Sequence, residues 1–115
     1  MSLDVILRSA VDVGGDQPEM VTWFEANITH NLNKMATHAG IYEQLWRPEE
    51  VDAMLGGDLI EALSRGLQDM KARPDHYRQF EAANGWGTYD QFVPWVEKYL
   101  DACVRFPAAA IEISR

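Results

Sequence analysis

Residues 3–16 read LDVILRSAVDVGGD, and this stretch decides how the fold begins. Apolar side chains recur at alternate positions from Leu3 to Val13, which is the two-residue period of a strand with one buried face. The Gly-Gly-Asp that follows has the chemistry of a turn. The next apolar run, Met20 to Ile28, can return as a second strand. The sequence therefore predicts a β-hairpin at the start of the chain.

The returning strand would divide its side chains between the two faces of the sheet. Strict alternation places Phe24 on the core face and Val21 and Trp23 on the opposite face. Ile6 and Ala10 would share that opposite face. If all helices pack on the core face, we expect the other face either to form a homodimer interface or to be covered by loops.

Beyond the hairpin, the spacing of apolar residues and the end signals predict about four or five helices. The first has an apolar face from Leu32 to Ala39 and ends at Gly40, and a short second helix runs from Pro48 to about Leu55. The third begins with a capping box of Asp58 and Glu61 and has an apolar face that runs to Met70, and a short fourth helix begins at Pro74 and includes Phe80. The last begins with a capping box of Thr88 and Gln91 and has an apolar face that runs to Cys103. Residues 41–46 show no regular period, and residues 109–114 alternate as a final strand. We expect one α+β domain over residues 1–115, with a small sheet covered by helices on one face.

Composition limits the classes of partner. The 115 residues carry a formal net charge of -8, which opposes binding to duplex nucleic acid because such binding depends on clustered lysines and arginines. The chain has neither a signal-peptide pattern nor a run that could span a bilayer, so we expect a cytoplasmic protein with no membrane partner. Cys103 is the only cysteine, and it is expected to pack as a small apolar side chain.

The first candidate site is the run Asn27-Ile28-Thr29-His30-Asn31, where the second strand gives way to a helix. On a helical wheel, His30 and Asn31 fall on one flank together with Lys34 and His38. These donors at a helix start predict an anion site for a phosphate or carboxylate. The alternative is that Asn27 and Thr29 cap the helix while the other side chains face water.

The second candidate site is the loop from residue 84 to residue 89, NGWGTY. Its two glycines allow close approach of a ligand to the backbone, and Trp86 and Tyr89 offer flat faces for stacking on a base or another ring. The alternative is that Trp86 fills the core and that the glycines only permit the turn. Trp46, beside Arg47 and Pro48, is likewise either a stacking residue of the site or a core residue. Arg115 is the last of the predicted ligand-binding residues.

We predict no catalytic residue, cofactor or metal ion. His30, His38 and His76 lack the spacing of a metal site, and the sequence contains no phosphate loop, dinucleotide fingerprint or nucleophile elbow. His30 could serve as a general base only with a carboxylate or an activated water beside it.

The strings NITHNL (27–32), KMA (34–36), AGIY (39–42), LWRP (45–48) and NGWGTY (84–89) resemble a family of small uncharacterised phage and bacterial proteins. The resemblance covers most of residues 23–115 and includes the last predicted helix and the ending Ser114-Arg115. It implies a soluble protein linked to phages, and it carries over no catalytic residue.

Together these patterns predict non-enzymatic binding of a small anionic or nucleotide-like molecule. In a phage setting, such a protein would sequester a defence signal in the host cytoplasm. The alternative is a protein-interaction or inhibitor module that uses Trp23 and the exposed sheet face.

Overall fold

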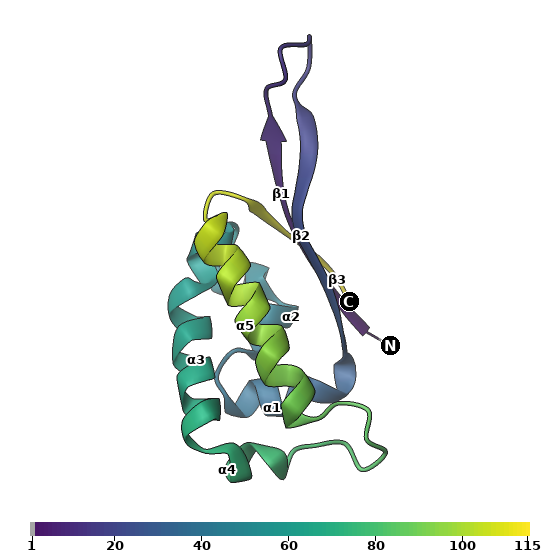
Figure 1. Ribbon diagram of the computed structural model, residues 1–115, viewed down its shortest axis with the longest axis vertical. Helices are drawn as coiled ribbons and strands as arrows, with labels where there is room; N and C mark the ends of the chain where they lie inside the picture. The colour runs from purple at the N-terminus through teal and green to yellow at the C-terminus, as the bar shows by residue number, and fades with distance from the viewer. Residues whose placement is uncertain (1) are drawn as a thin grey trace.

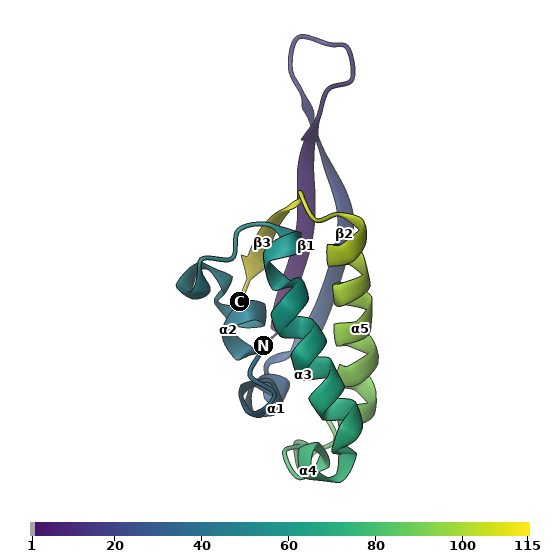
Figure 2. The ribbon, with the colours of Figure 1, turned by 90° about the vertical axis from the view of Figure 1, so that its left-hand side faces the viewer.

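A three-stranded antiparallel sheet forms one side of the molecule in the computed structural model, which describes residues 2–115. The strands are β1 (Ser2–Val11), β2 (Glu19–Thr29) and β3 (Ala110–Ser114), in the order β2-β1-β3. All helices lie on one face of this sheet, to the left of the strands in Figure 1 and in front of them in Figure 2. The predicted α+β architecture is therefore confirmed.

Five α-helices and three short 3-10 helices connect β2 to β3 within the described residues. They are η1 (His30–Leu32), α1 (Asn33–His38), α2 (Tyr42–Trp46), η2 (Pro48–Val51), η3 (Gly56–Leu59), α3 (Ile60–Ala72), α4 (Pro74–Arg78) and α5 (Tyr89–Arg105). Gly40 follows α1 with a φ of 76°, and the side chains of Thr88 and Gln91 form the predicted capping box of α5. None of the helices in this part of the chain is both long enough and apolar enough to cross a membrane.

Three of the predictions for the helical region are wrong. The helix expected from Pro48 to Leu55 is a single 3-10 turn, because Asp52 adopts the left-handed conformation with a φ of 57°. Leu55 instead pairs with Ala110 at the edge of the sheet. Asp58 does not cap α3; its carboxylate accepts hydrogen bonds from the amides of Met54 and Leu55, at 3.0 Å each. Residues 42–46, expected to be irregular, form α2.

The core lies between the sheet and the helices. Leu3, Val5 and Leu7 of β1 are fully buried, and so is Cys103 of α5, as predicted. Helix α3 passes so close to Ile41 that a Cβ atom on Gly66 would lie 2.5 Å from its Cγ2 atom. This close approach explains a glycine in the middle of a helix.

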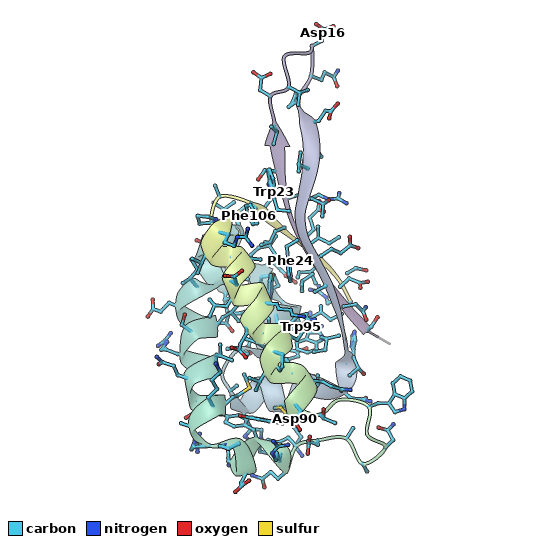
Figure 3. The ribbon with its side chains drawn as sticks, in the orientation of Figure 1. Asp16, Trp23, Phe24, Asp90, Trp95 and Phe106 are labelled. Carbon is cyan, nitrogen blue, oxygen red and sulfur yellow. The ribbon has the colours of Figure 1, made fainter. Side chains whose placement is uncertain are left out.

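A β-bulge changes the faces of β2. Leu7 pairs with Phe24 and Arg8 with Thr22, so Trp23 is an extra residue opposite this step. Trp23 therefore turns towards α5, where its ring stacks on Phe106 with a centroid distance of 5.0 Å (Figure 3). The prediction that Trp23 lies on the uncovered face is wrong, because strict alternation does not allow for the inserted residue.

The bulge moves Val21 as well. Val21 pairs with Ser9, which by alternation lies on the same face of β1 as Leu7, the side of the sheet that carries the helices. The prediction for Val21 is therefore also wrong.

The uncovered face of the sheet is mainly polar. Arg8 forms an ion pair with Glu112 at 3.2 Å and donates a hydrogen bond to Thr22 at 3.1 Å. Asn27 donates to Asp4 at 2.6 Å. These pairs suit a face of an antiparallel sheet that meets water.

The β1–β2 hairpin continues beyond the body of the protein. The last pair between β1 and β3 joins Arg8 to Ala110, whereas β1 and β2 remain paired as far as Val11 and Glu19. This two-stranded extension, residues 9–21, is called the arm below. It projects past the helices in both views (Figures 1 and 2) and contributes to a longest dimension of 53 Å.

Candidate functional site

A cleft of about 1080 Å³ opens where β2 leaves the sheet. Its walls are residues 27–31 at the end of β2 and the start of η1, residues 84–87 of the loop before α5, and Gln91 and Trp95 of α5, with Ser2 at the edge. The candidate segment 27–31 and the first four residues of the candidate segment 84–89 thus line one cleft.

The end of β2 is held by its own polar side chains. Thr29 accepts a hydrogen bond from the amide of Asn31 at 3.3 Å and so caps η1, as one alternative predicted. His30 Nε2 lies 2.7 Å from the carbonyl oxygen of Ser2. Because a carbonyl oxygen only accepts, Nε2 carries a hydrogen and donates it to Ser2.

Hydrogen bonds to its backbone hold the loop of residues 84–87 in place. The Asn84 side chain accepts a hydrogen bond from the amide of Trp86 at 3.0 Å, and the Asn31 side chain donates to the carbonyl of Trp86 at 2.9 Å. Gly87 has a φ of 114°, and a Cβ atom there would lie 3.2 Å from side-chain atoms of Leu32 and Thr29. The loop therefore packs directly on η1. The Trp86 side chain itself is 70% exposed.

Helix α5 completes the cleft. Gln91 accepts a hydrogen bond from the amide of Thr88 at 3.2 Å, and the Trp95 indole donates to the carbonyl of Asn27 at 3.1 Å. This second bond joins α5 to β2, the edge strand that forms the opposite wall. Figure 3 shows Trp95 projecting from α5 towards the strands.

The structure brings three of the eight predicted ligand-binding residues into the cleft: His30, Asn31 and Trp86. Lys34 and His38 lie elsewhere, against Phe80. The His38 ring stacks on the Phe80 ring at 3.9 Å, and Lys34 Nζ lies 5.8 Å from the same ring. The helical wheel failed here because residues 30–32 form a 3-10 helix with about three residues per turn, so the four side chains do not share one α-helical flank.

Trp46, Tyr89 and Arg115 do not line the cleft. Trp46 is only 2% exposed, and Tyr89 is 9% exposed and donates to the carbonyl of Met70 at 2.9 Å. Trp46 thus has the core position that the alternative interpretation gave it, whereas Trp86, for which the same alternative was open, is exposed. Arg115 donates to the carbonyl of Trp46 and to Glu49, both at 2.7 Å, and so anchors the end of the chain.

Sequence reasoning did not assign Gln91 and Trp95 to a ligand site, and it placed Asn27 and Asn84 in the candidate segments without predicting that they bind the ligand. The sequence predicts that Asn27 and Gln91 cap helices and that Trp95 belongs to an apolar helix face. A buried or half-buried indole needs a partner for its N–H group, and that need was the signal for Trp95. No local signal marked Gln91.

The cleft is nearly free of charge. Among the described residues that line it there is no lysine, arginine, aspartate or glutamate, and His30 is the one titratable side chain. No carboxylate of the described chain is hydrogen-bonded to His30, whose recorded hydrogen bond is to Ser2. Within residues 2–115, no three histidine, cysteine, aspartate or glutamate side chains gather in a way that could hold a metal ion. The arrangement is suited to hydrogen bonding and stacking.

In comparisons with protein-family models, curated proteins and solved structures, no match to the chain was found.

Proposed function

We propose that the protein binds a small nucleotide-like molecule in this cleft without catalysing a reaction on it. The observation that carries the proposal is the meeting of His30 and Asn31 with the exposed indole of Trp86, from segments 55 residues apart. An exposed aromatic face beside convergent polar groups is the usual composition of a ligand site.

The hydrogen bonds of the loop support this proposal. Both the amide and the carbonyl of Trp86 are held by side chains, of Asn84 and Asn31 respectively. The backbone is thus fixed while the indole stays in solvent, which costs hydrophobic stabilisation that a buried position would supply. An exposed indole on a fixed backbone is available to stack on a ring.

The predicted anion site has less support. Of the side chains predicted to form it, Lys34 and His38 lie against Phe80 and not in the cleft. The resemblance to phage proteins suggests a biological setting in which binding would sequester a host defence signal.

A thermal-shift panel tests the proposal. The wild-type protein is heated with mononucleotides, cyclic nucleotides and ADP-ribose, and a true ligand at about 100 times its Kd should stabilise it by about 2.7 kcal/mol. Trp86→Ala should abolish the shift. Trp23→Ala is the matched control, because Trp23 is 41% exposed but lies outside the cleft. The absence of any shift, or a shift that Trp86→Ala leaves unchanged, would contradict the proposal.

A second candidate function, protein binding, rests on the arm. Val13 at its tip is 55% exposed and Met20 is 59% exposed, and residues 9–21 carry three acidic and no basic side chains. An isolated two-stranded ribbon gains little stability alone, so a partner that covers it would stabilise it. The uncovered sheet face is polar, and the arm is therefore the better place for the interaction that the sequence suggested for Trp23.

Shortening the arm separates the two functions. Replacing residues 12–18 by Asn-Gly keeps a hairpin turn and removes the tip. In pull-downs from host lysate, loss of partners with this variant but retention of ligand-induced thermal shifts would assign protein binding to the arm. Equal recovery of partners by both proteins would remove this candidate.

A further inference from the structure

We propose that the cleft recognises the uncharged, planar base of its ligand through the amide side chains of Asn31, Asn84 and Gln91 and the Trp86 indole, and does not recognise a phosphate. This inference rests on the proposed function, because it states which part of the ligand the same cleft recognises.

The orientation of each amide follows from its partner. Asn31 faces the carbonyl of Trp86, so it presents its NH₂ group to this acceptor. Asn84 faces the amide of Trp86 and Gln91 faces the amide of Thr88, so both present their oxygens. The alternative, flipped orientations would place donor against donor or acceptor against acceptor.

The other end of each amide is therefore available to a ligand. The acceptor Asn31 Oδ1 and the donors Asn84 Nδ2 and Gln91 Nε2 have no hydrogen bond to another residue in the described chain. All three residues line the cleft. One acceptor together with two donors complements the edge of a nucleobase, which presents ring nitrogens, carbonyl oxygens and amino groups side by side.

Trp86 supplies the face that such a ring needs. Its 70% exposed indole belongs to the same loop as Asn84, and the backbone hydrogen bonds at residue 86 hold the loop against Asn31. Stacking of one base on an aromatic side chain contributes roughly a tenfold to hundredfold gain in affinity.

The charge distribution argues against recognition of the phosphate. The described lining residues include no lysine or arginine, and the whole chain carries a net charge of -8. An anionic group would gain no ion pair in the cleft and would be repelled by the protein at long range. We therefore expect the phosphate of a nucleotide to point out of the cleft.

Isothermal titration of the full chain tests this inference. The probes are adenosine, guanosine, cytidine and uridine, their 5′-monophosphates, ribose 5-phosphate and methyl β-glucoside, each at about 50 mM and about 500 mM NaCl. We expect one nucleoside to bind within about threefold of its monophosphate at both salt concentrations, because only the base makes contacts. Ribose 5-phosphate and methyl β-glucoside should not bind.

Two substitutions keep the fold and remove a ligand contact. Asn84→Asp and Gln91→Glu keep the oxygen that accepts from Trp86 or Thr88 but lose the free NH₂ donor. Each should weaken nucleoside binding by at least about tenfold, the effect of leaving a ligand acceptor unpaired. Asn33→Asp is the matched control, because Asn33 is exposed and lies outside the cleft, and it should bind as the wild type does.

The outcomes distinguish the two proposals. Binding of monophosphates and ribose 5-phosphate that weakens with salt would overturn base recognition and leave nucleotide binding intact. Unchanged nucleoside binding by Asn84→Asp and Gln91→Glu would also overturn base recognition. If no nucleoside or nucleotide binds, or if only methyl β-glucoside binds, the proposed function fails together with this inference.

Discussion

Trp46 and Trp86 are the same residue type in two regions that the sequence treated alike, and the structure uses them in opposite ways. Trp46 ends α2 and is 2% exposed, with its ring stacked on Tyr42 at 5.4 Å and edge-on to His30 at 6.1 Å. Trp86 is 70% exposed, and only its backbone is held. One side chain contributes to the core and the other is kept out of it.

The difference lies in what surrounds each indole. Helix α2 carries Leu45, a fully buried residue, into the core beside Trp46. The Trp86 loop has a glycine of positive φ on each side and packs on η1 through Gly87. The glycines let the backbone approach η1 closely while the side chain points away. The comparison predicts that Trp46 serves stability and Trp86 serves binding.

Removal of the Trp46 ring should have the largest effect. Trp46→Ala is expected to lower the free energy of unfolding by about 3–5 kcal/mol, because it leaves a large cavity in the core. Trp46→Phe should cost far less, since Nε1 has no hydrogen-bond partner among the described residues and its loss removes an unsatisfied donor. Urea denaturation measures both variants, and a cost below about 1 kcal/mol for Trp46→Ala would erase the contrast between the two tryptophans.

A methyl group at Gly87 should have the next largest effect. Gly87→Ala combines a φ of 114° with contacts of 3.2 Å to Leu32 and Thr29, so we expect a loss of about 1–3 kcal/mol. Gly14→Ala is the control, because Gly14 has a φ of 84° but nothing within 4 Å of an added Cβ atom. Denaturation curves that shift equally for both variants would show that packing of the loop on η1 contributes nothing.

Acid should weaken the Trp46 region more than the Trp86 loop. The pKa of Glu49 lies below its ordinary value of 4.5, because the carboxylate accepts hydrogen bonds from the backbone amide of Glu49 and from the Arg115 side chain. Arg115 also donates a hydrogen bond to the carbonyl of Trp46. This contribution to stability is present above pH 4.5 and is lost as the pH falls through the lower pKa of the folded state.

Glu49→Gln removes that titration and measures its share. Between about pH 5 and about pH 3, the variant should lose less stability than the wild type in thermal denaturation. Parallel curves for the two proteins would show that the Glu49–Arg115 contact does not contribute to the acid response.

Removal of the Trp86 ring should have the smallest effect on stability. Trp86→Ala is expected to change the free energy of unfolding by less than about 0.5 kcal/mol, because the indole is largely in solvent. The same variant should lose ligand binding in the thermal-shift panel. A large loss of stability would mean that the indole packs on the body of the protein in solution, and the contrast with Trp46 would fail.

Local signals in the sequence predicted much of the fold. The alternation in β1, the capping box of Thr88 and Gln91, and the glycine after α1 depend on residues a few positions apart, and each has its predicted place. Asp58 shows the limit of such signals. It has the spacing of a capping residue for α3, yet it binds the amides of Met54 and Leu55, because those amides compete for the same carboxylate.

The candidate site was predicted only in part, for a related reason. His30, Asn31 and Trp86 meet as the sequence suggested, whereas Lys34 and His38 turn towards Phe80 because η1 is wound more tightly than an α-helix. Whether any of these residues binds a ligand remains a prediction.

By itself, the sequence determined the hairpin, the long helix α5, the final strand and the two segments that line the cleft, because periodicity and capping are properties of neighbouring residues. The tertiary structure alone decided which tryptophan is buried, where the bulge turns Trp23, and that residue 31 binds residue 86. Those outcomes depend on which surfaces pack together after the chain has folded, and residues 55 positions apart carry no local record of one another.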